Sequence, residues 1–179
     1  MKYILDTNTF WDVLKNWNSV NVSDILSKLK DKEVITFALS EISAMEIHSV
    51  LGKCIRGIPK GEHKCERTIK TEQGISVCTN TWITSNYQKR LNERETKDLI
   101  RLINDILKQR DKSFNVSIIP LTDEIIEKGG NLLQKYAYRY DFHSLDALIG
   151  ATAIKTSKTL LTYDKKLKNV LIEEGLSVE

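Results

Sequence analysis

Four short apolar runs, separated by stretches with helical spacing, limit the fold of this chain more than any other feature. The runs cover residues 2–5, 34–39, 117–121 and 159–163. Helical patterns lie between them, as in the stretch that contains Phe10, Val13 and Trp17. Strands that alternate with helices in this way pair in parallel, because each helix returns the chain across the sheet. The sequence therefore predicts an α/β fold with a largely parallel sheet.

The remaining helices are expected at about 23–29, 86–110, 122–136 and 146–154. Ser43 and Glu46 have the spacing of a capping box, which predicts that another helix begins at Ser43. Between about 52 and 84 the pattern breaks, because this stretch holds four glycines, Pro59 and all three cysteines. We expect a single domain over residues 1–179 that carries an irregular Cys-containing insertion at about 52–84.

Length and charge narrow the class of protein but indicate no partner. The 179 residues suit one domain, and 27 Lys and Arg against 24 Asp and Glu leave a net charge of +3. No apolar run approaches the roughly 18 residues of a membrane span, and residues 1–2 lead straight into a strand-like run instead of a secretory leader. We expect a cytoplasmic protein with no membrane segment and with reduced cysteines.

The cysteines leave one alternative open. His63, Cys65 and Cys78, with Cys54 or His48 as a fourth ligand, would supply the Cys and His ligands that structural zinc prefers. No Cys-x-x-Cys pair is present, so the spacing favours free thiols in the insertion.

Acidic residues are placed to meet at one edge of the predicted sheet. Asp6 and Asp164 end the first and last apolar runs, and first helical turns at the same edge hold Glu46 and Asp146. Carboxylates this close repel one another unless a cation compensates, and Mg²⁺ prefers oxygen ligands. The pattern indicates metal-assisted hydrolysis of a phosphodiester. The alternative is that each acid is only a cap or a turn residue, since helix N-termini and turns favour Asp and Glu.

Four sequence blocks resemble the successive motifs of PIN-domain ribonucleases. They are Ile-Leu-Asp-Thr-Asn at 4–8, Ile-Ser-Ala-Met-Glu-Ile at 42–47, Asp-Ala-Leu-Ile-Gly-Ala-Thr-Ala at 146–153 and Leu-Thr-Tyr-Asp at 161–164. The blocks occur in the family's order and span nearly the whole chain, and the last two are the most specific. In appearance the chain is most similar to the VapC-type toxins of prokaryotic toxin–antitoxin pairs.

The resemblance implies a three-layer α/β/α sandwich and a metal-dependent endoribonuclease, the toxin of a type II pair. It makes Asp6, Glu46, Asp146 and Asp164 an acidic quartet, in which Asp6, Asp146 and Asp164 hold Mg²⁺ or Mn²⁺. Asn8 and Thr162 match residues that orient those carboxylates. A VapC-like protein would also form a homodimer, bind a small antitoxin protein and cleave RNA.

Several features remain open beside the quartet. Asp141 lies five residues before Asp146 and would either add a carboxylate or cap a helix, and capping is the plainer interpretation. Compact VapC-like toxins lack a stretch like 52–84, which leaves antitoxin recognition and substrate choice undetermined. The first part of this stretch is rich in basic residues, which either contact RNA phosphates or belong to a solvated loop. The candidate RNA contacts are Lys53, Arg56, Lys60 and Lys64.

Two other functions compete with the nuclease. The first is a non-catalytic PIN-like module that binds RNA or protein and keeps the acids for structure. The second is a phosphatase of the aspartyl-phosphate type, which requires a second Asp two residues after the nucleophilic Asp. Asn8 stands at that position, so the sequence disfavours the phosphatase.

Overall fold

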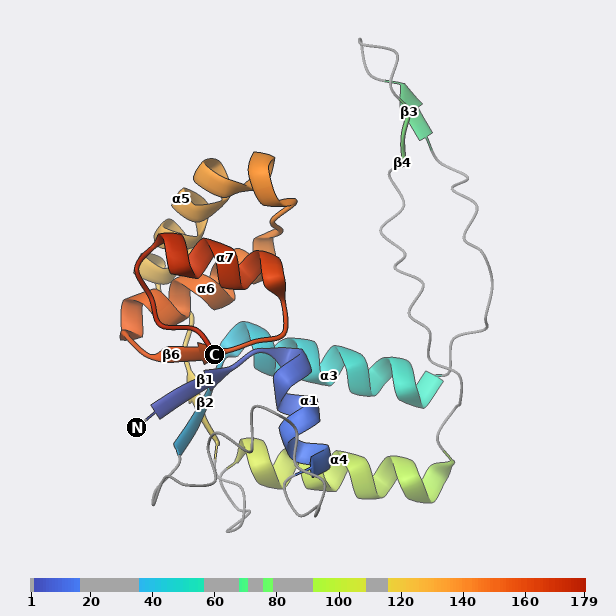
Figure 1. Ribbon diagram of the computed structural model, residues 1–179. Coiled ribbons are helices and arrows are strands. Elements are labelled where there is room, and N and C mark those ends of the chain that lie inside the picture. The colour runs from blue at the N-terminus through green and yellow to red at the C-terminus, as the bar shows by residue number, and fades with distance from the viewer. Residues whose placement is uncertain (1, 17–35, 57–67, 71–75, 79–91, 109–115) are drawn as a thin grey trace. The chain divides into compact units, whose positions relative to one another are not determined.

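The structure is a computed structural model that describes residues 2–16, 36–56, 68–70, 76–78, 92–108 and 116–179 (Figure 1). The chain divides into two compact units. One comprises Met1–His48 and Arg101–Glu179, and the other comprises Ser49–Ile100.

The first unit is built on a four-stranded parallel sheet. Its strands are β1 (Lys2–Leu5), β2 (Thr36–Ser40), β5 (Val116–Ile119) and β6 (Thr159–Leu161), in the spatial order β5-β2-β1-β6. All three pairings are parallel. In the centre of the sheet Ile4 lies opposite Ala38 of β2 on one side and Leu160 of β6 on the other. The predicted α/β fold with a largely parallel sheet is confirmed.

Both faces of this sheet are buried, as the alternation of side chains along β1 shows. Ile4 belongs to a core cluster that it shares with residues of α5 (Asp123–Tyr140), α6 (Ser144–Thr156) and α7 (Lys165–Glu173). Its neighbours Tyr3 and Leu5 point to the opposite face and are also fully buried. Figure 1 shows α1 (Thr7–Asn16) on that second side of the sheet. The sheet thus forms the middle of a three-layer α/β/α sandwich.

The helix that follows β2 begins earlier than the sequence predicts. This helix, α3, covers Glu41–Arg56, and the Ser40 hydroxyl accepts a hydrogen bond from the Ser43 backbone N–H at 2.9 Å. The prediction that Ser43 caps this helix is wrong, because Ser40 is the first hydroxyl after the strand and takes the cap position. Glu46 accordingly lies in the second turn of α3.

The other helices follow the predicted pattern with shifted ends. Helix α4 covers Glu93–Leu107 and has a capping box that the prediction missed: Asn92 and Glu95 exchange backbone-to-side-chain hydrogen bonds of 2.9 and 2.8 Å. Thr122 caps α5, and its hydroxyl accepts from Ile125 N–H. Helix α7 was not predicted, although Asp164 caps it. None of the helices in the described ranges is long and apolar enough to span a membrane.

The stretch predicted to be irregular is only partly described. Helix α3 extends into it, and β3 (Thr68–Lys70) pairs antiparallel with β4 (Ser76–Cys78). His63 and Cys65, which the zinc alternative requires, lie outside the described residues, as does the helix expected at about 23–29. The insertion therefore stays a prediction.

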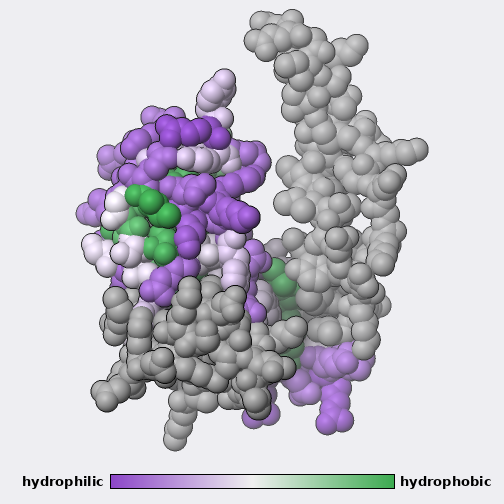
Figure 2. Space-filling view, viewed as in Figure 1, coloured by the Kyte–Doolittle hydropathy of each residue, from purple (hydrophilic) through white to green (hydrophobic). Residues whose placement is uncertain are grey.

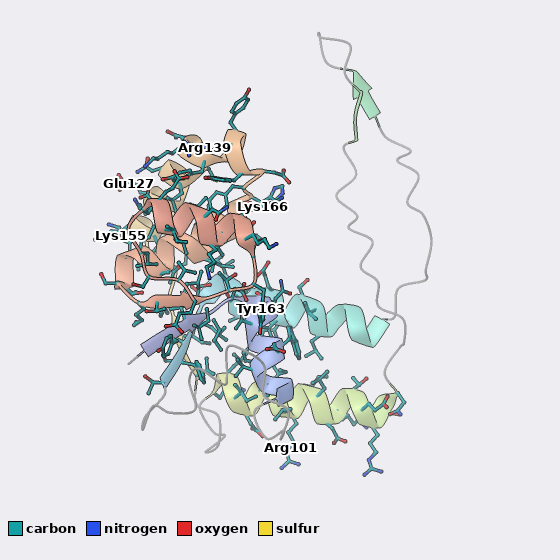
Figure 3. All side chains as sticks on the ribbon, in the orientation of Figure 1. Arg101, Glu127, Arg139, Lys155, Tyr163 and Lys166 are labelled. Carbon is teal, nitrogen blue, oxygen red and sulfur yellow. The ribbon has the colours of Figure 1, made fainter. Side chains whose placement is uncertain are left out.

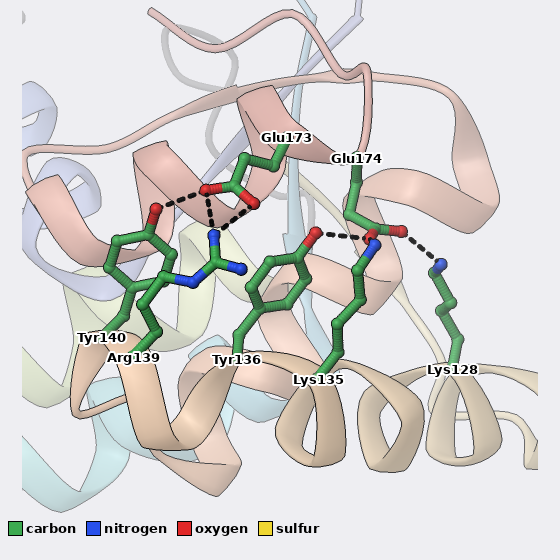
Figure 4. A network of polar contacts seen from close by, with 7 residues as sticks. All are labelled: Lys128, Lys135, Tyr136, Arg139, Tyr140, Glu173 and Glu174. Carbon is green, nitrogen blue, oxygen red and sulfur yellow. Dashed lines mark hydrogen bonds and ion pairs between the residues drawn. The ribbon is translucent and has the colours of Figure 1, made fainter.

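A polar network joins α5 to the end of α7 (Figure 4). Glu174 accepts hydrogen bonds from Lys128 at 2.6 Å and from both Lys135 and Tyr136 at 2.8 Å. Arg139 contacts both carboxylate oxygens of Glu173 at 2.9 Å. The surface over these helices is mostly hydrophilic, with one small apolar area (Figure 2). The network fixes α7, and with it the β6–α7 turn, against α5.

Candidate active site

The strand order creates one point where ligands are expected to bind. From β1 the chain adds β2 and then β5 on one side, whereas β6 pairs with the opposite edge of β1. Crevices of open α/β sheets form at such reversals, beyond the carboxyl ends of the strands. Asp6 follows β1 at this point, and Thr162 follows β6.

Asp6 is held rigidly at the start of α1. Only 5% of the residue is exposed, and its Oδ1 accepts a hydrogen bond from the Thr9 backbone N–H at 2.6 Å. Its Oδ2 accepts from the Thr162 hydroxyl. Asp6 is therefore the N-cap of α1.

Thr162 connects the first and last strands of the sheet. Its hydroxyl donates to Asp6 and accepts from the Asp164 backbone N–H at 3.0 Å. Its own backbone N–H donates to the Glu179 carbonyl oxygen at 3.0 Å. Because its hydroxyl and its backbone N–H both have partners, this buried threonine fixes the carboxylate of Asp6 and the start of the β6–α7 turn together.

Asp146 and Asp164 share an electrostatic environment with Asp6. Asp146 lies half-buried in the first turn of α6, and Asp164 caps α7 by accepting from Lys166 N–H at 2.7 Å. Burial raises the pKa of Asp146, and the negative charges of Asp164 and Asp6 raise it further. A hydrogen bond from the His143 backbone opposes this rise. Carboxylates from three helix starts thus act on one another.

Glu46 is tied to the segment beside Asp6. The Thr7 hydroxyl donates to Oε2 of Glu46 at 2.5 Å, and Thr7 directly follows Asp6 in the chain. The contact joins α3 to the first turn of α1, so the fourth acid of the predicted quartet approaches the same strand end.

The other predicted site residues lie apart from the quartet or outside the described residues. Asn8 is exposed in the first turn of α1, and Asp141 pairs with Lys166 and His143 at 2.6 and 3.6 Å. Within the described contacts, the structure brings Thr162 to the quartet but neither Asn8 nor Asp141. Of the predicted RNA contacts, Lys53 and Arg56 belong to α3 with side chains that are not described, and Lys60 and Lys64 are not described at all.

Two residues at the site were missed from the sequence. Thr7 lies inside the Asp-Thr-Asn block, but its bond to Glu46 spans 39 positions and leaves no local signal. Lys166 does have a local signal in the sequence, because a lysine in the first turn of a helix interacts unfavourably with the helix dipole. Its position two residues after Asp164 marks it as a cation beside the acids.

The donor set suits a hard divalent cation bound by few protein ligands. Among the described residues, no group of three or more His, Cys, Asp or Glu side chains is arranged to hold a metal ion. Mg²⁺ usually takes only one or two carboxylates, with water and substrate oxygens completing its octahedron. Burial raises the pKa of Asp146, the charges of Asp164 and Asp6 raise it further, and a cation at this site would relieve the repulsion among the three carboxylates.

Fold and sequence together define the class. The described unit is an α/β sandwich with acids at the switch point of its sheet, and a sequence profile described as the PIN domain matches residues 3–171. The chain belongs to the PIN-domain family, which confirms the resemblance seen in the sequence blocks. No curated protein is similar enough in sequence to count as a match.

Solved structures of toxin–antitoxin proteins share this fold. The Rickettsia felis VapBC2 complex, bound to a promoter DNA fragment, is 18% identical with a TM-score of 0.52, covering 100% of this chain and 98% of that one. FitAcB from Neisseria gonorrhoeae is 15% identical with a TM-score of 0.55, over 98% and 95%. Mycobacterium tuberculosis VapC20, a toxin that cleaves the sarcin-ricin loop, is 14% identical with a TM-score of 0.51, over 93% of each chain.

Proposed function

We propose that this protein is a Mg²⁺- or Mn²⁺-dependent endoribonuclease and the toxin of a type II toxin–antitoxin pair. One observation carries the nuclease proposal: three carboxylates meet at the switch point of the sheet, where burial, and then the charges of Asp164 and Asp6, raise the pKa of Asp146. Mutually repelling carboxylates at a binding crevice are characteristic of sites built for cations. Membership of the PIN-domain family supports the same conclusion.

In this proposal Asp6, Asp146 and Asp164 hold the metal, and Glu46 positions the attacking water. The cation, when bound, would lower the pKa of that water and neutralise charge on the scissile phosphodiester. The chain's own contribution is orientation. Thr9 N–H and the Thr162 hydroxyl fix both oxygens of Asp6, the Thr7 hydroxyl fixes Glu46, and backbone N–H groups of α7 fix Asp164.

A cleavage assay tests the nuclease. The purified protein, freed of any partner, should cleave RNA in Mg²⁺ or Mn²⁺ and lose this activity in EDTA. Asp6→Asn should lower the rate at least 100-fold, while Asp123→Asn, an exposed first-turn acid of α5, should leave it unchanged. A wild-type protein that cleaves no RNA in either metal would refute the enzymatic proposal.

The assay also separates the nuclease from the alternative, a non-catalytic PIN-like module that binds RNA or protein. The observation that favours the module is that Asp6 and Asp164 already have a structural role, since each caps a helix. For the module, calorimetry would detect no Mn²⁺ binding and Asp164→Asn would leave the metal response of the melting temperature unchanged. For the nuclease, Mn²⁺ should raise the melting temperature of the wild type and have a smaller effect on Asp164→Asn.

We further propose a cytoplasmic homodimer that a small antitoxin protein inhibits. The toxin–antitoxin complexes among the similar structures support the antitoxin, since this chain shares their fold. Induced expression should arrest growth, and co-expression of a small protein encoded by a neighbouring gene should relieve the arrest. A neighbouring protein that copurifies with the chain but leaves RNA cleavage unchanged would contradict the antitoxin role.

A further inference from the structure

Lys166 is a cation placed beside the acidic quartet. It lies in the first turn of α7 (Figure 3), two residues after Asp164. Its Nζ contacts Oδ2 of Asp141 at 2.6 Å. Asp141 ends α5 in the left-handed conformation, with φ at 50°. The ion pair therefore connects the turn before α6, the helix that carries Asp146, with the turn that carries Asp164.

Lys166 also contacts the quartet directly through its backbone. Its N–H donates to Oδ1 of Asp164 at 2.7 Å. Its Nζ is held by Asp141, which lies five residues before Asp146. The ammonium is thus anchored between the turns that carry these two acids.

Stability does not account for this lysine. The side chains of Lys166 and Asp141 are 49% and 74% exposed, and a pair this exposed adds little net stability because water screens it. A positive charge in the first turn also opposes the dipole of α7. The unfavourable interaction with the helix dipole offsets part of the stability that the ion pair provides. Stability alone therefore does not explain why a lysine stands here.

We propose that Lys166 binds a phosphate of the nucleic-acid substrate next to the acidic quartet, and that Asp141 is its resting partner in the free protein. The inference rests on the proposed nuclease function and adds a substrate contact to it. An RNA strand reaching this site meets several carboxylates, and a nearby ammonium offsets their repulsion of the phosphates. Lysine suits this role, because its long stem lets the charge leave Asp141 and bind phosphate as a point charge.

The salt dependence of RNA binding tests the contact. Single-stranded RNA binding would be followed by fluorescence anisotropy in EDTA at several KCl concentrations. Lys166→Ala should weaken binding and reduce the slope of log K against log salt by about 0.7, the value for one lost phosphate contact on a single strand. Lys166→Arg, which keeps the charge, should retain the wild-type slope.

Lys155 provides the matched control. It pairs with Glu124 at 3.5 Å, is 42% exposed and lies in the last turn of α6. Lys155→Ala removes an equivalent exposed charge and should leave the slope as it is. Because both lysines are exposed, both variants should melt like the wild type.

Asp141→Asn tests the resting pair. Releasing the ammonium should tighten RNA binding several-fold in the wild-type background and much less in Lys166→Ala, since the effect acts through Lys166. Equal effects in the two backgrounds would reduce Asp141 to a general repulsive charge and refute its role as resting partner.

Cleavage kinetics distinguish a failure of the proposed Lys166–phosphate contact from a failure of the proposed nuclease function. With Mn²⁺ present, Lys166→Ala should raise KM for RNA several-fold with a smaller effect on kcat. If Lys166→Ala matches Lys155→Ala in slope and in KM, the phosphate contact is refuted while the nuclease stands. If the wild type cleaves no RNA, the proposed function fails, and the anisotropy slopes alone decide whether Lys166 contacts RNA.

Discussion

At the scale of single residues, the acids of the site also serve as helix caps. Asp6 caps α1 and Asp164 caps α7 through side-chain bonds to backbone N–H groups. From the sequence alone, capping and metal binding are alternative roles for these acids. In the structure the two roles are compatible for the same carboxylate. A carboxylate has about four lone-pair sites, so one cap bond orients it and leaves others for a ligand.

Replacing Asp146 with asparagine should stabilise the metal-free protein. Its pKa is raised in the folded state by burial and by the charges of Asp164 and Asp6, so the ionised form disfavours folding at neutral pH. Asparagine removes the charge and can still accept the His143 hydrogen bond. We expect the melting temperature in EDTA at pH 7 to rise by a few degrees, since about 1 kcal/mol corresponds to 2–4 °C in a chain of this size.

The pH dependence of the same variant checks the cause. The carboxyl of Asp146 has a higher pKa in the folded protein than in the unfolded chain. Below the unfolded pKa the acid is protonated in both states and does not oppose folding, whereas above the folded pKa its charge destabilises the folded protein. The gain from Asp146→Asn should therefore vanish below about pH 4. A gain of equal size at pH 3 and pH 7 would show that packing, and not charge, is responsible.

At the scale of elements, the α5–α7 network makes a separate contribution to stability. Hydrogen bonds from Lys128, then Lys135 and Tyr136, lower the pKa of Glu174 from 4.5 to about 2. Its side chain is only 12% exposed, so the charge pairs are poorly screened. Glu174→Gln should cost roughly 2 kcal/mol of unfolding free energy at pH 7.

This cost should vanish at low pH, as the gain from Asp146→Asn does, although the two substitutions change stability in opposite directions. The folded carboxyl pKa is depressed, so its contribution is present above pH 4.5 and is lost as pH falls towards 2. Urea titrations of the wild type and Glu174→Gln should therefore converge near pH 2. Glu173→Gln is the control, because its partner Arg139 is 58% exposed and water screens the pair, so this substitution should change stability much less.

Two helical glycines should respond oppositely to alanine. A Cβ on Gly150 of α6 would meet Leu167 and Leu171 of α7 at 3.2 and 3.3 Å, whereas a Cβ on Gly130 of α5 meets nothing within 4 Å. Gly130→Ala should stabilise the protein by about 0.5–1 kcal/mol through helix propensity. Gly150→Ala should lose that gain or destabilise, because α6 and α7 must move apart. Equal melting-temperature rises in the two variants would contradict a close α6–α7 contact.

Elements with strong local patterns were predictable from the sequence, and those set by competing signals were not. The parallel strands and α6 follow from apolar runs and small residues. The start of α3 was displaced because Ser40 and Ser43 are both plausible caps, and only the end of β2 decides between them. Helix α7 was missed because Asp164 was considered only as a strand-end acid.

At the scale of the whole molecule, the site depends on strand order, which no local pattern contains. The quartet was predicted because parallel strands end at one edge and because the sequence blocks resemble a family. The bond from Thr162 to Asp6 joins residues 156 positions apart and depends on β6 pairing with β1. Lys166 was missed because α7 was not predicted, so its place in a first helical turn could not be recognised, and its partner Asp141 is 25 positions away.

The same long-range order makes the site sensitive to residue 179. Glu179 N–H donates to the Leu160 carbonyl oxygen, and its own carbonyl oxygen accepts from Thr162 N–H, both at 3.0 Å. Glu179→Pro removes that N–H and leaves a buried carbonyl of β6 without this partner, a loss of about 1–3 kcal/mol. Because Thr162 orients Asp6, RNA cleavage should also fall several-fold.

Glu179→Ala separates the backbone from the side chain. Alanine keeps the N–H, so its melting temperature and cleavage rate should match the wild type. A proline variant that melts and cleaves like the alanine variant would show that this edge contact neither supports β6 nor steadies Thr162. A loss confined to the proline variant would show that Asp6 is held in place by backbone pairing that runs from β1 through β6 to residue 179.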